Sequence, residues 1–309
     1  MVSPVPTGQG AATLDKAARL LAPGVRRGVL LGPMTTYRVG GPAALFLEIG
    51  DEAALERACR AVATTGVPVL VVGKGSNLLV ADAGFPGLAL RLGDRYGAVA
   101  CEGESLVAGA AAAYPVVARR SVAAGLAGLE WAVGIPGSVG GAVRMNAGGH
   151  GAETSDVLVA AEIVDLAAGV PAPRRLGRAE LGFAYRTSCL GPSDLVIGAE
   201  YRLEAGDRDA SAARLGEIVR WRRENQPGGQ NAGSVFTNPP GDSAGRLVDS
   251  AGLKGFRIGT AAVSRKHANF IQADPGGSAD DVRRVIDAVR AKVAERTGVE
   301  LALEVRLVG

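Results

Sequence analysis

Three glycine-rich segments carry the clearest chemical signal in the sequence: TTYRVGGPA from Thr35, VGKGSNLLV from Val72 and GIPGSVGGAVRMNAGGHG from Gly134. Glycine lets main-chain amides approach a phosphate closely, and consecutive N–H groups form anion-binding nests without a positive side chain. No segment matches GxGxxG after a strand or GxxxxGK[ST], so Rossmann and P-loop sites are disfavoured. One such loop is as often a simple turn, but three together predict a dinucleotide-like ligand held largely by backbone amides.

Other chemistries find little support. The only histidines are His150 and His267, and Cys59, Cys101 and Cys189 show no CxxC spacing. A histidine-rich metal site, a Ser-His-Asp hydrolase, a thiolate zinc site and a disulfide framework are therefore improbable, and no metal is expected. We interpret the cysteines as small buried apolar residues.

Charge and hydropathy narrow the class of protein further. The 34 Lys and Arg residues against 31 Asp and Glu residues leave too small an excess for the basic surface of a nucleic-acid binder. Neither a signal peptide nor an apolar run of membrane-spanning length is present. We expect a soluble cytoplasmic protein that binds neither nucleic acid nor membrane.

The elements around the glycine segments indicate an α/β protein. A chain of 309 residues suggests two or three domains. The spacing of Leu55, Cys59 and Val62 predicts a helix over residues 52–65 that ends at Gly66, followed by a strand VPVLVV. Two more apolar strands are predicted, VLVAAEIVDL from residue 157 and DLVIGAEYRL from residue 194.

After Ala205 the composition becomes polar and charged, and we place a domain boundary there. An apolar stripe of Leu215, Ile218 and Val219 predicts a helix with a basic end. Ser278 and Asp281 form a capping-box signal for the last helix, which Gly298 closes; one face is lined by Val282, Val285, Ile286, Val289 and Val293. The segment VELALEVRLV then alternates as a strand that points Glu304 away from the core.

The segment GIPGSVGGAVRMNAGG resembles the UDP-N-acetylenolpyruvoylglucosamine reductase (UDP-N-acetylmuramate dehydrogenase) family. Four further segments resemble that family in the same order: VGKGSNLLV, FAYRTS, NAGSVFTNP and AGLKGFRIGTAAVSRKHANFI. The C-terminal LEVRLVG resembles the end of the family's sequences, so the likeness covers nearly the whole chain after about Thr35.

The resemblance implies an α/β (α+β) fold with an FAD-binding region of the vanillyl-alcohol-oxidase (PCMH) type, made of two subdomains, over residues 35–204. Residues 1–34 would pack on this region, and residues 205–309 would form a C-terminal α/β substrate-binding domain. The short connection between FAYRTSCL and DLVIGAEYRL suggests the subtype that lacks the long tyrosine loop. A monomer is expected.

The implied activity is the NADPH-dependent reduction of UDP-N-acetylglucosamine enolpyruvate to UDP-N-acetylmuramate, in the synthesis of peptidoglycan precursors. Flavin N5 would give the hydride, Ser234 would donate the proton, and Arg186 and Glu304 would stabilise the enolate-like intermediate. Without the motifs, a surface arginine, a turn serine and a solvated glutamate would be the better interpretations of these three residues.

The resemblance also assigns binding residues. Arg222, Asn238 and His267 would contact the substrate. The FAD would be bound by residues of all three glycine segments: Tyr37, Arg38, Gly40, Gly73, Lys74, Gly75, Ser76, Asn77, Leu78, Gly134, Ile135, Pro136, Gly137, Ser138, Gly140, Gly141, Asn146, Ala147 and Gly148.

Two alternatives stay open. A flavin oxidase or dehydrogenase could use the same FAD-binding architecture, because a fold does not fix a function. A nucleotide-sugar binding or regulatory protein could keep the scaffold without catalysis, although the presence of Arg186, Ser234 and Glu304 together argues against it. The sequence leaves regulation and the preference for NADPH over NADH undetermined.

Overall fold

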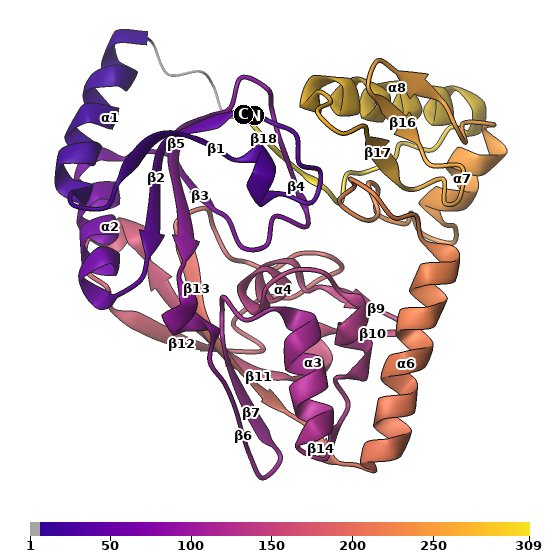
Figure 1. Cartoon of the computed structure of the whole chain (residues 1–309), viewed down its shortest axis with the longest axis horizontal. Coiled ribbons are helices and arrows are strands. Elements are labelled where there is room, and N and C mark those ends of the chain that lie inside the picture. The colour runs from indigo at the N-terminus through magenta and orange to yellow at the C-terminus, as the bar shows by residue number, and fades with distance from the viewer. Residues whose placement is uncertain (1–6) are drawn as a thin grey trace. The chain divides into compact units, whose positions relative to one another are not determined.

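The fold is that of a computed structural model, which describes residues 7–309. The chain forms two compact units, each discontinuous in sequence (Figure 1). Unit 1 contains the residues up to Val29, Ala44–Lys74 and Pro86–Arg220; unit 2 contains Leu30–Ala43, Gly75–Phe85 and Trp221–Gly309. The sequence predicts a division of the chain after residues 34 and 204, according to which ligand each part is expected to bind, and that division stays a prediction.

The first part of unit 1 is a four-stranded sheet with two helices. The strand order is β1-β2-β5-β3, from β1 (Arg26–Leu30), β2 (Pro42–Ile49), β3 (Val69–Val71) and β5 (Phe85–Leu92). The helices α1 (Thr7–Leu21) and α2 (Glu52–Thr65) lie side by side along it (Figure 1). Asp51 caps α2 by accepting from the Ala54 amide at 2.7 Å, and Gly66 ends it with φ 62°, so the predicted helix is confirmed.

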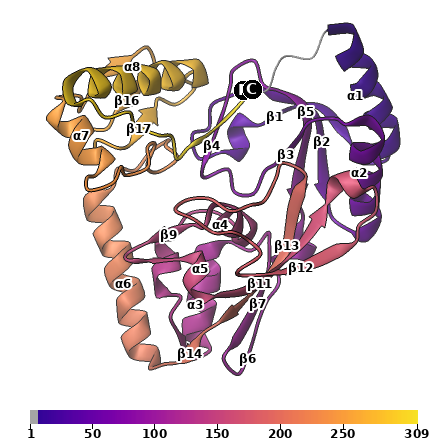
Figure 2. The ribbon, with the colours of Figure 1, turned by 180° about the vertical axis from the view of Figure 1, so that it is seen from behind.

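The second part of unit 1 is a five-stranded antiparallel sheet in the order β12-β11-β13-β7-β6 (Figure 2). Its strands are β6 (Val99–Glu102), β7 (Ser105–Gly109), β11 (Leu158–Asp165), β12 (Pro173–Gly177) and β13 (Asp194–Arg202). The predicted strands at residues 157 and 194 are confirmed as β11 and β13. The helices α3 (Tyr114–Ala123) and α4 (Val139–Met145) pack their apolar residues into the same core.

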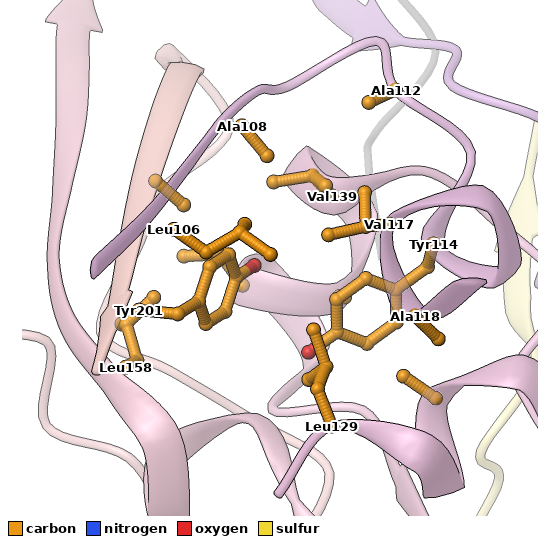
Figure 3. Close-up of a cluster of buried hydrophobic side chains, with 14 of the residues drawn as sticks. Leu106, Ala108, Ala112, Tyr114, Val117, Ala118, Leu129, Val139, Leu158 and Tyr201 are labelled. Atoms are coloured by element: carbon orange, nitrogen blue, oxygen red, sulfur yellow. The ribbon is translucent and has the colours of Figure 1, made fainter. Parts of the chain in front are cut away.

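Figure 3 shows the centre of this second core, where Tyr114 and Tyr201 lie among Leu106, Val117 and Leu129. The two tyrosine ring centroids are 6.2 Å apart, and both rings are fully buried. Unit 1 thus holds two separate apolar cores, one beneath each sheet. Its short elements are η2 (Asp94–Gly97), β8 (Leu126–Ala127), η3 (Glu130–Gly134), β9 (Gly148–Gly149), β10 (Ala152–Glu153), α5 (Thr154–Val157), η4 (Leu166–Ala168) and β14 (Glu204–Ala205).

Unit 2 has its own core, built on helix α8 (Ala279–Thr297) and a three-stranded sheet. The predicted apolar face of α8 is confirmed, since its valines and Ile286 are fully buried. The other elements are η1 (Gly32–Met34), β4 (Leu78–Val80), α7 (Ala244–Ser250), β15 (Arg257–Ile258), β16 (Ala261–Val263), β17 (Ile271–Ala273) and β18 (Arg306–Val308). Helix α6 (Arg208–Asn225) contributes residues to both units, and its Ile218 is buried as the stripe predicts.

Two predicted strands are shorter than expected. VPVLVV forms only β3, and of the ten residues VELALEVRLV only Arg306–Val308 form a strand, β18, paired in parallel with β4. The alternation does place Leu301 and Val305 in the core. Residues 299–305 bond instead to a loop and to side chains. The Glu304 amide donates to the carbonyl of Val235, and the Arg290 side chain donates to the carbonyl of Leu301. The periodicity is therefore correct, but no single neighbouring strand pairs with the whole segment.

The interpretation of the cysteines is correct only for Cys59, which is buried and whose pKa is raised to about 11 by that burial. Cys101 and Cys189 are exposed. Cys101 lies on β6, the edge strand of its sheet, and Cys189 lies in a loop where its thiol donates to the Glu180 carbonyl. Exposure follows from these edge and loop positions, which composition does not reveal.

The predicted capping box of α8 forms only in part. The Ser278 hydroxyl accepts from the Asp281 amide at 3.2 Å, but the Asp281 carboxylate turns to Thr260, accepting from its amide at 2.6 Å and its hydroxyl at 2.8 Å. A distant residue completes the cap: Asp82, just after β4, accepts from the Ala279 and Asp280 amides and from the Ser278 hydroxyl. Asp82 therefore ties the second glycine segment to helix α8.

Replacing Asp82 by alanine should lower the free energy of unfolding by about 1 kcal/mol, because two amides of the first helical turn lose their acceptor. Urea unfolding measures this change. Asp287→Ala is the matched control, since it removes only the exposed ion pair with Arg283 and should cost less than about 0.5 kcal/mol. Equal losses in the two variants would contradict the capping role of Asp82.

Candidate functional site

A pocket of about 120 Å³ lies in unit 1, between its two sheets. Five residues predicted to bind FAD line it: Gly73, Lys74, Ser138, Gly140 and Gly141. The remaining lining comes from Val71, Val72, Arg91, Leu92, Asp94, Gly97, Ala110, Ala111, Arg144, Asp194 and Val196. The pocket therefore brings together the second and third glycine segments, which are far apart in the sequence.

Close backbone approach explains the glycine at position 73. A Cβ atom there would lie 2.4 Å from the Ser138 hydroxyl oxygen, which is far inside van der Waals contact. Ser138 is itself fixed, because it caps helix α4 and accepts from the Gly141 amide at 3.3 Å. The Gly73 backbone thus packs directly against the Ser138 side chain, and both segments border the pocket.

The charges around the pocket are mixed. Lys74, Arg91 and Arg144 are opposed by Asp94 and Asp194. The Asp194 carboxylate accepts from the Gly191 amide at 2.8 Å and pairs with Arg174, and the Arg144 guanidinium donates to the Gly191 carbonyl at 2.8 Å. Cationic side chains in a glycine-lined pocket suit a diphosphate, and the carboxylates are acceptors of the kind that bind ribose hydroxyls.

The sequence interpretation missed Arg91, Asp94, Arg144 and Asp194. Arg91 lies near the end of β5, and Asp194 begins β13. Charged residues at the ends of otherwise apolar strands are a usable signal, because ligands of open α/β sheets bind near strand ends. This signal does not say which strand ends share a pocket.

The first glycine segment and residues 75–80 of the second lie together in unit 2. Gly75 has φ 62°, and a Cβ atom there would be 2.2 Å from the Met34 carbonyl oxygen. The Thr36 amide donates to the Gly75 carbonyl at 3.2 Å. The predicted FAD residues Tyr37, Arg38, Gly40 and Ser76–Leu78 therefore belong to one local structure.

Tyr37 is fully buried in the core of unit 2, and this burial raises the pKa of its phenol well above the ordinary value. Within residues 7–309 its hydroxyl has no hydrogen-bond partner. Its ring packs among the apolar side chains of the unit 2 core.

Arg186 lies in a tight turn of unit 1 between β12 and β13. Its φ of 58° is in the left-handed region, which is unusual for a residue with a long side chain. The guanidinium donates to the Gly148 carbonyl at 3.0 Å and stacks 4.7 Å from the Tyr185 ring centroid. The third glycine segment therefore contacts the proposed catalytic arginine directly.

Ser234 and Glu304 lie on adjoining segments of unit 2. The Glu304 amide donates to the carbonyl of Val235 at 2.9 Å, and the Asn77 side chain donates to the Glu304 carbonyl at 3.0 Å. Both Ser234 and Glu304 are partly buried. The structure thus brings two of the three predicted catalytic residues into neighbouring positions.

Asn269 supports the Ser234 segment and was not identified from the sequence. It is buried, and its amide pairs with both backbone groups of Phe236, donating to the carbonyl at 2.8 Å and accepting from the N–H at 3.0 Å. Its own carbonyl accepts from the Val235 amide at 2.9 Å. A polar residue inside the apolar run ANFIQA is the signal that could have found it.

The predicted substrate residues Arg222, Asn238 and His267 all lie in unit 2. Burial lowers the pKa of the partly buried Arg222. Asn238 accepts from the Ala244 amide at 3.1 Å at the start of α7. His267 accepts through Nδ1 from the Asn269 amide at 3.2 Å and packs edge-on against Phe270, so it has a structural role whether or not it binds a ligand.

Among residues 7–309, no group of three or more His, Cys, Asp or Glu side chains is arranged to hold a metal ion. No helix in that range has the length and apolar character needed to cross a membrane.

Two protein families match the sequence. The FAD binding domain family matches residues 43–170, and the family described as UDP-N-acetylenolpyruvoylglucosamine reductase, C-terminal domain, matches residues 225–308. The first match contains the pocket-lining segments around Gly73 and Ser138, and the second contains Ser234 and Glu304.

Individual proteins match over almost the whole chain. A UDP-N-acetylenolpyruvoylglucosamine reductase from Rubrobacter xylanophilus is 44% identical over 297 residues, 96% of this chain and 99% of the relative. One from Heliobacterium modesticaldum is 45% identical over 278 residues, 89% of this chain and 88% of that relative. The crystal structure of the Thermus caldophilus reductase superposes with a TM-score of 0.81 at 38% identity, covering 92% of this chain and 99% of that one.

The environment of His267 predicts a dependence of stability on pH. Burial lowers the pKa of His267, and the nearby Lys254 lowers it further. The unfolded chain, with an ordinary histidine pKa of about 6.5, therefore binds a proton before the folded protein does. The contribution of neutral His267 to the free energy of unfolding should be fully present above about pH 6.5. It should decrease as the pH falls toward the lowered pKa of His267 in the folded protein.

Urea unfolding of the wild type and of His267→Gln between pH 8 and pH 5 tests this dependence. The stability advantage of the wild type should shrink as the pH falls. A constant difference between wild type and His267→Gln would contradict the prediction.

Proposed function

The chain belongs to the UDP-N-acetylenolpyruvoylglucosamine reductase family and is an FAD-dependent oxidoreductase, and from this premise we propose the details of its reaction. NADPH would be the reductant of the bound FAD, and UDP-N-acetylglucosamine enolpyruvate would be the substrate reduced to UDP-N-acetylmuramate for peptidoglycan synthesis. The observation that carries the proposal is the match to a reductase over 96% of this chain and 99% of that relative's length.

The residues of the pocket fit a dinucleotide diphosphate. Gly73 and Ser138 pack so closely that a Cβ atom at position 73 would clash with the serine hydroxyl, and Lys74, Arg91 and Arg144 supply positive charge around the pocket. These residues would hold the diphosphate of FAD through backbone amides and cations. When bound, the flavin supplies the hydride-transfer chemistry that the side chains of the protein cannot provide.

The three predicted catalytic residues have complementary roles in this proposal. Reducing an enol ether next to a carboxylate places negative charge on the adjoining carbon, and the protein must stabilise that charge before a proton arrives. Arg186, permanently charged, would bind the substrate carboxylate through its planar fork. Glu304 would act as a second hydrogen-bond donor in its protonated form, and the Ser234 hydroxyl would protonate the carbon.

The substrate contacts and the setting of the reaction belong to the same proposal. Arg222, Asn238 and His267 would bind the UDP or the sugar, and the partly buried Arg222 guanidinium suits a phosphate. We expect a monomer that acts in the cytoplasm.

An anaerobic visible spectrum of the purified protein tests the proposed function. NADPH should bleach the yellow FAD spectrum, and UDP-N-acetylglucosamine enolpyruvate should then restore it. A protein that stays colourless after incubation with FAD would contradict the cofactor assignment. Bleaching without recovery on addition of substrate would favour another flavin enzyme, and a yellow protein without turnover would favour a binding protein.

Ser234→Ala should leave reduction of the flavin by NADPH nearly unchanged but slow reoxidation by the enolpyruvyl substrate by about 100-fold or more, because only the second half-reaction needs the proton. Stopped-flow absorbance measures both rates. Ser250→Ala is the control, since the Ser250 hydroxyl donates to the Leu247 carbonyl within α7 and has no proposed role. Equal losses in the two half-reactions would exclude Ser234 as the proton donor.

Gly73→Ala should weaken FAD binding by about tenfold or more, because the added Cβ displaces Ser138 from the start of α4. Titration of apoprotein with FAD, followed by flavin fluorescence, measures the affinity. Gly50→Ala is the control, because a Cβ at Gly50 meets no atom within 4 Å. Wild-type affinity in Gly73→Ala would place the FAD diphosphate outside this pocket.

A further inference from the structure

The backbone of Arg186 adopts a conformation that needs outside support. A non-glycine residue at φ 58° costs on the order of 1 kcal/mol or more and persists only where its surroundings fix it. The turn closes through two hydrogen bonds between Ala184 and Thr187, each 3.1 Å long. Such a short bridge does not by itself anchor the turn to the rest of unit 1.

The anchor comes from the end of helix α4. Asn146, which ends α4 with φ 42°, is fully buried and donates from its side-chain amide to the Ala184 carbonyl at 3.2 Å. Two further bonds link the same regions: Ser188 donates to the Arg144 carbonyl at 2.7 Å, and Arg186 donates to the Gly148 carbonyl at 3.0 Å. The turn is therefore attached to α4 and the following loop before, at and after Arg186.

The side-chain amide of Asn146 makes its hydrogen bonds to other groups of the protein. Its second N–H donates to the Glu153 carboxylate at 2.8 Å, and its oxygen accepts from the Ser155 amide at 2.9 Å. Both N–H groups of the side chain are thus used, so the FAD contact expected of Asn146 from the sequence would have to come from its backbone. The Glu153 carboxylate is held in turn by the Ser155 hydroxyl at 2.9 Å, so Asn146 is fixed on two sides.

We propose that Asn146 is a positioning residue that holds the turn carrying Arg186, and that it affects reduction of the enolpyruvyl substrate through Arg186. This inference rests on the proposed function, in which Arg186 binds the substrate carboxylate. Because the arginine is always charged, its position is the property that the surrounding protein can set. The bonds of Asn146 attach the Arg186 turn to the end of helix α4. The first turn of the same helix lines the pocket.

Asn146→Gly is the informative variant, because glycine keeps the left-handed backbone without strain and removes only the side-chain bonds. The first readout is limited trypsin digestion of the FAD-loaded protein, followed by mass spectrometry. Cleavage after Arg186 should be about tenfold faster in Asn146→Gly than in the wild type, while cleavage after the exposed Arg178 should be unchanged. Val117→Ala, a cavity in the same core, controls for general loss of stability and should not change the ratio of the two cleavages.

The second readout is a double-mutant cycle on the two half-reactions at saturating FAD. Asn146→Gly should slow reoxidation by the enolpyruvyl substrate by about tenfold and alter reduction by NADPH by less than about twofold. In the Arg186→Ala background, adding Asn146→Gly should cause no further loss.

Unchanged cleavage after Arg186, or an equal loss of reoxidation in both backgrounds, would overturn the proposal. If Arg186→Ala itself reoxidises at the wild-type rate, the proposed function of Arg186 fails, and so does the effect of Asn146 on the reaction. The digestion then still decides whether Asn146 holds the turn, so the two failures are distinguishable.

Discussion

Hydrogen bonds from a few polar side chains fix the glycine segments, and the rest of the structure depends on this constraint. Glycine gives a loop no side chain to bury, so the apolar packing that fixes helices and strands is missing there. Asp82, Asn77 and Asn146 supply the missing anchors from within the segments or directly after them. An asparagine suits this task because its amide offers both donors and an acceptor, as a peptide group does. The glycine segments are therefore fixed at their ends without bulky side chains of their own.

The same kind of anchor is found beside each of the three proposed catalytic residues. Asn146 bonds to the Arg186 turn, Asn77 to the carbonyl of Glu304, and Asn269 to the backbone that follows Ser234. Each amide gives an irregular segment a hydrogen bond to its backbone in place of a regular strand partner. Within each unit, the segments expected to bind FAD and the segments expected to act on the substrate are consequently joined by direct bonds.

The sequence predicted those parts of the fold in which local patterns decide the outcome. Helices α2 and α8 carry a cap, an apolar face and a closing glycine, and strands β11 and β13 are apolar runs long enough to pair along their length. The segment 299–308 shows why pattern alone is insufficient, since its alternation is correct but its partners are a loop and side chains. Likewise, neither the pocket lined by Arg91 and Asp194 nor the exposure of Cys101 follows from sequence spacing, because each depends on which strands are neighbours. The assignment of individual FAD and substrate residues came from family resemblance and stays a proposal.

The composition explains why positioning matters so much in this protein. With two histidines and no described cluster of metal ligands, few side chains of the described chain can change protonation near neutral pH. An arginine offers a fixed charge, so its effect on a reaction depends on where it is held and on how well its surroundings exclude competing water. The backbone of Arg186 is strained, and such strain is retained only where the surrounding bonds compensate for it. The bonds from Asn146, Gly148 and Ser188 are the compensation that the structure provides.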